Sequence, residues 1–474
     1  MKKLKVGFVA GFMEGFSRAG LDTFAGYAKD LAELGRRMSF EVVHYPKPVM
    51  TVNDARGIRE DLDAKGVDFL LLFHPAYIIG DNVYELMKTR ANIGLWAIEE
   101  PREEGPMPLA SFVNLCQNMG IAHQMFKASP RKVKWFFGPI DGPLFLPRFE
   151  ITMRALYAVK NLRNARVAQI GKLMDGHINH SLDNRDIAAH LGIDVNRDYE
   201  VEDIVAMADT MSDAEAAAEL ERINASGAKH AMGEGKIRYA VKMGVAVRRL
   251  AEENDWSAVA FSCAPKLMVL KGTIGCMVNS ILNDALVPGG CEADVGGTVS
   301  MLVLKLLSGQ TTVLMDLPRF DVADNSLMIW HCGTAPLDMA GSKGIVLEKH
   351  YMAANSTDSI LKDVGPVLNM SFKPGDMTVF RLTGEADSFY YFTGRFFDDG
   401  KKTYNGSRGW VKDLNLYREP VKVLDLMNTV MTRAWAHHFP MVMKDVSAYV
   451  EELAWWLDLK RVKKAEYRDY LSVE

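Results

Sequence analysis

The sequence predicts two α/β domains followed by a β-rich C-terminal domain that ends in helices. In residues 1–160, short apolar β-rich runs alternate with helical patterns, which is typical of βαβ units and a parallel sheet. The same alternation resumes over residues 161–290. Beyond residue 290, many short strands follow one another at the spacing of an antiparallel barrel or sandwich. The predicted domains are therefore 1–160, 161–290 and 291–474.

The first domain contains four expected strands and two expected helices. The turn after its first strand, residues 11–15, reads GFMEG and lacks the G-x-G-x-x-G fingerprint of dinucleotide binding. We therefore expect no NAD site. The expected strands are residues 5–10, 40–44, 67–73 and 93–98, and the expected helices are residues 20–37 and 53–65.

The second and third domains differ in their expected secondary structure. The second combines strands at 165–171 and 257–262 with helices at 202–211, 213–226 and 235–254. The third opens with a helix at 297–307 and continues with strands at 311–316, 326–331, 344–347, 377–383 and 388–397. Helical segments at 443–457 and 460–470 are expected to close the chain.

Composition excludes several classes of protein. Of the 474 residues, 48% are apolar, as in a globular protein with sizeable cores. The 60 acidic and 56 basic residues are mixed along the chain and give a net charge of -4, so no nucleic-acid partner is expected. The apolar run after the basic N-terminus, residues 6–10, is too short for the hydrophobic region of a signal peptide and no cleavage pattern follows it, so we expect no export. No uncharged apolar run reaches the roughly 18 residues that span a bilayer. The five widely spaced cysteines contain no CxxC pair, which favours reduced thiols in the cytoplasm.

The stretch CEADVGG, residues 291–297, places the carboxylates Glu292 and Asp294 just before an apolar helix. Asp316 lies where an apolar strand meets Leu-Pro, and we expect it at a sheet rim. His331 ends another strand, and His437 and His438 stand together in an apolar context before an expected helix. These side chains are hard ligands and imidazoles within one β-rich domain.

Two carboxylates and two histidines would form an octahedral site for Mn²⁺ or Mg²⁺, with Co²⁺ as a further alternative. No cysteine pair has the spacing of a structural zinc site. Each residue also has a structural interpretation: Glu292 and Asp294 as helix caps, Asp316 as a turn residue and His331 as a core histidine. The spacing alone leaves both interpretations open.

The order of these motifs resembles the L-arabinose and L-fucose isomerase superfamily. The resemblance extends to the first domain, where residues 113–117, VNLCQ, are similar to an N-L-x-Q segment that presents a substrate-binding glutamine, here Gln117. It implies two Rossmann-like α/β domains and a C-terminal antiparallel β-barrel domain that carries most of a Mn²⁺ site. It also implies a homo-oligomer, often a hexamer, in which Gln117 would serve the site of a neighbouring chain.

Carried over by position, Glu292 and Asp316 match the two metal carboxylates, and His331 and His438 match the two histidine ligands. His437 would then contact the sugar. The implied reaction is aldose–ketose isomerisation of an open-chain sugar through a cis-enediol, with Glu292 and Asp316 as the proton-transfer pair. The assignment of acid and base within this pair stays open, and Asp294 is expected to fix the turn.

The sequence departs from arabinose isomerases at two places. Val295 and Gly296 replace the Trp-Lys that follows E-G-D in those enzymes, and the glutamine after the first strand is replaced near Met13. The resemblance therefore also allows a modified hexose such as sulfoquinovose as the substrate. The alternatives are an L-arabinose or L-fucose isomerase proper, a sugar-binding protein without catalysis, and a metal-dependent hydrolase.

Overall fold

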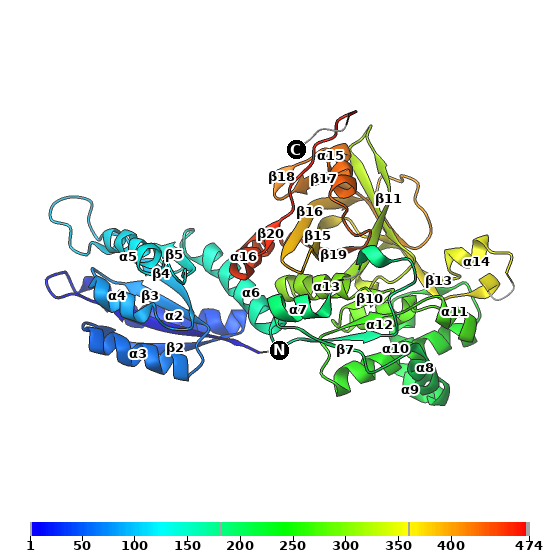
Figure 1. Ribbon diagram of the computed structural model, residues 1–474, viewed down its shortest axis with the longest axis horizontal. Helices are drawn as coiled ribbons and strands as arrows, with labels where there is room; N and C mark the ends of the chain where they lie inside the picture. Colours follow the sequence, from blue (N-terminus) through cyan, green and yellow to red (C-terminus); the bar gives the residue numbers. More distant parts are fainter. Residues whose placement is uncertain (1, 181, 359–360, 471–474) are drawn as a thin grey trace. The chain divides into compact units, whose positions relative to one another are not determined.

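The computed structural model describes residues 2–180, 182–358 and 361–470 of the chain (Figure 1). The chain divides into two compact units, Met1–Lys160 and Asn161–Glu474. The second unit contains both the second α/β segment and the β-rich segment of the sequence. The predicted boundary at residue 290 within this unit remains a prediction.

The first unit is built on a five-stranded parallel sheet with the strand order β2-β1-β3-β4-β5. Strand β3 is buried at every position, as expected for a parallel strand covered by helices on both faces. The predicted alternation of strands and helices is confirmed here. The strands are β1 (Leu4–Gly11), β2 (Phe40–Val49), β3 (Phe69–His74), β4 (Asn92–Ala97) and β5 (Val133–Phe137), and the helices are α1 (Ala19–Asp22), α2 (Phe24–Met38), α3 (Val52–Ala64), α4 (Gly80–Leu86), α5 (Ser111–Met125) and α6 (Leu146–Leu162).

The second unit contains a four-stranded parallel sheet with the order β10-β9-β6-β7. The chain runs from β6 to β7 on one side and later to β9 on the other side of β6. Open α/β sheets bind ligands at the carboxyl ends of strands where the order reverses in this way. The elements are β6 (Arg166–Ile170), a 3-10 turn (Ile178–His180), α7 (Asn184–Leu191), β7 (Asp194–Asn196), α8 (Val201–Thr210), α9 (Asp213–Ala225), β8 (Lys229–His230), α10 (Glu234–Glu253), β9 (Ala258–Phe261), α11 (Lys266–Lys271), α12 (Cys276–Asp284) and β10 (Gly289–Cys291).

Helix α13 (Val295–Ser308) is the central element of the second unit. Every one of its 14 residues is buried, because it packs against β9 and β10 of the small sheet and against β11, β15 and β19 of the large sheet. A helix that is apolar all round can be stable only in such a buried position. The segment that joins β10 to α13 therefore lies between the two sheets.

The large sheet contains eleven strands and is mixed. Its order is β20-β16-β15-β19-β11-β12-β17-β14-β13-β8, with β18 on β17 and a further pairing between β16 and β17. A purely antiparallel domain was the wrong prediction, because β8, β14 and β20 pair in parallel with β13, β17 and β16. The elements are β11 (Thr312–Asp321), β12 (Ser326–His331), a 3-10 turn (Leu337–Met339), β13 (Ala340–Glu348), α14 (Tyr351–Asn355), a 3-10 turn (Leu361–Asp363), β14 (Val367–Phe372), β15 (Gly375–Thr383), β16 (Ser388–Phe397), β17 (Ser407–Leu416), β18 (Glu419–Pro420), α15 (Val423–Thr432), β19 (Phe439–Val442), α16 (Ser447–Leu457) and β20 (Lys460–Arg461).

The end of the described chain corrects one helix prediction. Helix α16 is present, but residues 460–470 form the short strand β20 followed by irregular chain rather than a helix. Lys460 and Arg461 pair with Ser388 and Phe389 of β16, and the Val462 N–H donates to the Phe389 carbonyl. Further along, the Ala465 and Tyr467 N–H groups donate to side chains of α15, Thr429 at 3.0 Å and Asp425 at 2.9 Å, so these backbone groups are satisfied without a helix.

Hydrophobic clusters among the described residues contribute to the core of the second unit. One lies under the large sheet, and another joins the small sheet to α8, α10 and α12. Within the ranges that the structure describes, no helix combines the length and the apolar character needed to cross a membrane.

Candidate active site

The E-x-D stretch forms a tight connection from β10 to α13. Glu292 and Ala293 both have left-handed backbone conformations, with φ of 60° and 55°, which non-glycine residues adopt at a cost. The turn is held on both sides: the Ala293 N–H donates to the Phe261 carbonyl at 3.1 Å, and the Met174 N–H donates to the Glu292 carbonyl at 3.3 Å. Glu292 is therefore fixed beside the carboxyl ends of β6, β9 and β10.

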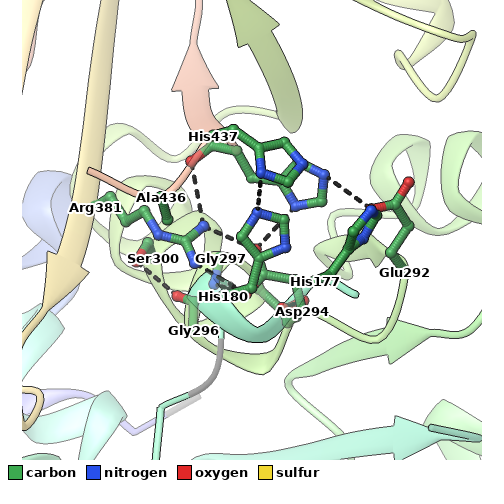
Figure 2. Close-up of polar contacts among 12 residues, drawn as sticks. His177, His180, Glu292, Asp294, Gly296, Gly297, Ser300, Arg381, Ala436 and His437 are labelled. Carbon is green, nitrogen blue, oxygen red and sulfur yellow. Dashed lines mark hydrogen bonds and ion pairs between the residues drawn. The ribbon is translucent and has the colours of Figure 1, made fainter. Parts of the chain in front are cut away.

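Asp294 caps α13, as predicted, by accepting a hydrogen bond from the Gly297 N–H at 2.8 Å. It also does more than fix the turn. The fully buried Asp294 carboxylate accepts two hydrogen bonds from the Arg381 guanidinium and lies 3.0 Å from His438 Nδ1. Figure 2 shows Arg381 reaching the start of α13, where it contacts Asp294.

Strand pairing brings Asp316, His331 and His438 together. In the antiparallel register Asp316 of β11 faces Trp330, next to His331 at the end of β12. On the other side of β11, Met315 pairs with Phe439, so the adjacent residue Asp316 lies beside His438. Donor atoms of Asp316, His331 and His438 all lie within 4.8 Å of one another.

The predicted secondary structure around Asp316 and around the pair His437–His438 was wrong. Asp316 is in the middle of β11 rather than at its end, because an irregularity in register between Asp316 and Arg319 lets the strand continue past Pro318. The histidine pair precedes strand β19, not a helix, because residues 439–442 pair with both β11 and β15.

Glu292 joins this group through His438. Glu292 Oε2 lies 3.2 Å from His438 Nε2, so the two carboxylates of the E-x-D stretch stand at opposite nitrogens of one imidazole ring. The structure thus brings Glu292, Asp316, His331 and His438 into one neighbourhood, although the sequence separates them widely.

The two carboxyl groups have opposite electrostatic environments. Burial alone would raise the pKa of Glu292, but the hydrogen bond and charge of His438 outweigh it and hold the pKa at about 2. Burial raises the pKa of Asp316 to about 7, against the opposing charge of His438. One carboxyl group of the pair is thus stabilised as the anion and the other as the acid.

The two histidines also differ. Burial would lower the pKa of His438, but Asp294 and Glu292 together raise it to about 9. Burial, followed by the charge of His438, lowers the pKa of His331 to about 3. The Nδ1 atom of His331 lies 3.1 Å from the Cys332 sulfur, which leaves its Nε2 atom free to face another group.

His177 and His180, which the sequence analysis missed, lie at the same site. They belong to the segment after β6, and His177 Nδ1 lies 2.6 Å from Glu292 Oε2. His180 Nε2 lies 3.0 Å from His437 Nδ1 (Figure 2). The His180 ring also stacks on that of His438, with centroids 4.0 Å apart. The H-x-x-H spacing after a parallel strand was the only sequence signal for this pair.

The two predicted sugar-binding residues lie in different units. His437 is exposed and adjoins the site through His177 and His180, with donor atoms of His177, His180, Glu292 and His437 within 4.8 Å of one another. Gln117 is exposed on α5 of the first unit, where its side chain contacts Tyr77 and Asn114. The sugar contacts assigned to both residues remain predictions.

The donor set fits a hard divalent cation. Asp316 Oδ1 is a buried oxygen atom without a hydrogen-bond partner among the described residues, and Glu292 Oε2 faces nitrogen atoms of His177 and His438 at 2.6 and 3.2 Å. Buried carboxylate oxygens are costly unless they are paired or coordinate a cation. Carboxylate oxygens together with imidazole nitrogens are ligands that Mn²⁺ accepts.

The cysteines do not form a disulfide among the described residues. Cys263, Cys276, Cys291 and Cys332 are buried free thiols in the core of the small sheet, and Cys116 is exposed. Reduced thiols were the prediction from the spacing.

Comparison with known proteins points to sugar isomerases, although no family model matches the chain. Sulfoquinovose isomerase of Priestia megaterium (strain ATCC 12872 / QMB1551) is 20% identical over 446 residues, which cover 91% of this chain and 95% of that protein. Sulfoquinovose isomerase of Alkalicoccus urumqiensis is 22% identical over 362 residues, or 76% and 77% of the two chains. That of Clostridium sp. (strain MSTE9) is 27% identical over 219 residues, or 45% of each chain. These similarities support a sugar isomerase family and indicate that the chain is an enzyme, an aldose–ketose isomerase.

Proposed function

We propose that the protein is a cytoplasmic, metal-dependent isomerase that converts the open-chain aldose sulfoquinovose into the corresponding ketose. The observation that carries the proposal is that ligand atoms of Asp316, His331 and His438 lie within 4.8 Å of one another, and that Glu292 Oε2 lies 3.2 Å from His438 Nε2. The relatives of Priestia megaterium and Alkalicoccus urumqiensis, which are similar over 95% and 77% of their own length, supply the substrate class.

Glu292, Asp316, His331 and His438 would hold the divalent cation, for which Mn²⁺ is the first candidate. Bound there, the cation supplies Lewis-acid polarisation of the sugar carbonyl. His331 and His438 each use Nδ1 for a protein contact, with Cys332 and Asp294 respectively, so Nε2 is the atom each offers to the site.

The chain itself would move the protons. One of the two carboxyl groups, Glu292 or Asp316, would remove the C2 proton while O1 gains a proton, which gives a cis-enediol. The other carboxyl group would then return a proton to C1 while the O2 hydroxyl loses its proton, which gives the ketose. The strained turn at Glu292 and the pairing of β11 with two neighbours hold the two carboxyl groups in place, so neither must be ordered when the sugar binds.

Direct product analysis tests this function. Purified protein with Mn²⁺ is incubated separately with sulfoquinovose, L-arabinose and L-fucose, and the products are followed by NMR and mass spectrometry. We expect a new ketose signal at unchanged mass with sulfoquinovose and much slower conversion of the two neutral sugars. Preferred conversion of L-arabinose or L-fucose would contradict the proposed substrate, and a change of mass would indicate hydrolysis instead.

A further inference from the structure

A buried ion pair lies behind the site. The Arg381 side chain of β15 is 2% exposed and that of Asp294 is fully buried. Arg381 donates from one terminal nitrogen to Asp294 Oδ2 at 2.8 Å and from the other to Asp294 Oδ1 at 3.0 Å. This two-point geometry is the strongest form of a guanidinium–carboxylate contact.

Stability alone does not account for this pair. Removing two charges from water costs about as much as their attraction returns, so a buried pair is often no more stabilising than apolar side chains of the same size. Both side chains lie in the interior of the second unit, where apolar residues would pack without that cost. The pair therefore calls for a role besides packing.

The contacts of the pair converge on His438. Asp294 Oδ2 lies 3.0 Å from His438 Nδ1, and Arg381 donates to the His438 main-chain carbonyl at 3.2 Å. The ring and the backbone of the same residue are thus held from one side. A carboxylate can only accept a hydrogen bond, so it requires the proton on Nδ1 and directs Nε2 to the opposite side, toward Glu292 at 3.2 Å.

Glycine at the start of α13 makes this arrangement possible. A Cβ atom on Gly297 would lie 2.4 Å from Asp294 Oδ2 and 2.8 Å from the Arg381 terminal nitrogen, closer than nonbonded atoms approach. Any larger residue at position 297 would displace the ion pair. Gly297, the last residue of CEADVGG, thus provides the space in which Arg381 reaches Asp294 (Figure 2).

We propose that Asp294 and Arg381 are positioning residues that hold His438 with its proton on Nδ1 and its Nε2 atom presented to the cation site. The inference rests on the proposed function, since it assigns His438 as a ligand. Outer partners of this kind orient a metal-binding imidazole, and their loss weakens metal affinity by about 10- to 100-fold.

The test measures Mn²⁺ binding directly, from the signal of free Mn²⁺ in electron paramagnetic resonance. Asp294→Asn keeps the shape of the side chain but can present an N–H to Nδ1 and so stabilise the wrong tautomer. We expect a Mn²⁺ dissociation constant raised about 10- to 100-fold. Ser300→Ala is the matched control, because Ser300 lies on the same helix and bonds to Gly296 and Leu382 but touches neither Asp294 nor His438. This control should leave Mn²⁺ affinity unchanged even if it lowers the melting temperature.

A double-mutant cycle separates positioning from general structure. In a His438→Ala background, Asp294→Asn should weaken Mn²⁺ binding no further, since the ring it positions is gone. An equal loss in both backgrounds, or unchanged affinity of the folded Asp294→Asn variant, would overturn the inference. If Asp294→Asn does not fold, Arg381→Lys, which keeps the charge but loses the two-point contact, carries the same cycle.

The experiments distinguish failure of the positioning role of Asp294 from failure of the proposed isomerase function. Wild-type protein that binds Mn²⁺ but isomerises none of the tested sugars would refute the function and leave the role of Asp294 intact. If the wild-type protein isomerises sulfoquinovose but the folded Asp294→Asn variant binds Mn²⁺ with unaltered affinity, the function would stand and the positioning role of Asp294 would be refuted.

Discussion

Glu292 and Asp316 reach the same histidines by different routes. Glu292 is placed by a strained turn between a strand and a buried helix, whereas Asp316 is placed by its two neighbouring strands. Both residues could be selected from the sequence because acidic residues next to long apolar runs are conspicuous. His177 and His180 could not, because the sequence does not show that the segment after β6 turns back toward Glu292.

Replacement of Glu292 tests the role of that carboxylate. Glu292→Gln keeps the side-chain size but removes the oxygen that can take a proton or bind a cation strongly. We expect kcat for sulfoquinovose isomerisation to fall by about 10²- to 10⁴-fold while the circular dichroism spectrum stays unchanged. Glu221→Gln, on the exposed surface of α9, is the control and should keep full activity. Full turnover by Glu292→Gln would refute the assignment.

Secondary structure followed the sequence closely where apolar periodicity was strong. The strands at 326–331 and 388–397 and the buried helix α13 lie where they were predicted. The predictions failed where tertiary contacts decide the structure: the charged segment 460–470 begins as a short strand paired with β16 and continues as irregular chain instead of forming a helix. β11 likewise continues past Pro318, which a local pattern would treat as its end.

The buried histidine at the end of β3, His74, should make the stability of that strand depend on pH. His74 is fully buried, its Nδ1 lies 3.2 Å from the Leu72 carbonyl and its Nε2 lies 2.9 Å from the Asn118 amide nitrogen. Burial lowers the pKa of His74 from 6.5 to about 4. The folded state therefore favours the neutral ring, whose stabilisation is fully present above pH 6.5 and is lost as the pH falls from 6.5 to about 4.

A pKa lowered by this amount corresponds to about 3 kcal/mol of stability, of which most is lost by pH 4. Hydrogen exchange of the β3 amides, corrected for the intrinsic exchange rate, should show protection that declines more steeply with acid in wild type than in His74→Gln. Equal pH dependence in the two proteins would show that His74 does not titrate in this way.

At the scale of the whole molecule, the site depends on long-range pairing within the second unit. α13 packs against both sheets, and β11 lies between β12, which ends at His331, and β19, which begins directly after His438. The sequence indicated parallel α/β segments followed by a β-rich one, but the parallel pairings of β8, β14 and β20 had no local signal. Such pairings join distant segments, so only the folded chain reveals them.

The central claim is that Glu292, Asp316, His331 and His438 hold a cation needed for isomerisation. Removal of the metal tests this claim most directly. The protein is dialysed against a chelator until no divalent metal is detectable, and sulfoquinovose isomerisation is followed by NMR before and after Mn²⁺ is returned to the same sample. We expect activity to disappear and then to recover with Mn²⁺. Undiminished isomerisation in the metal-free sample would contradict the account.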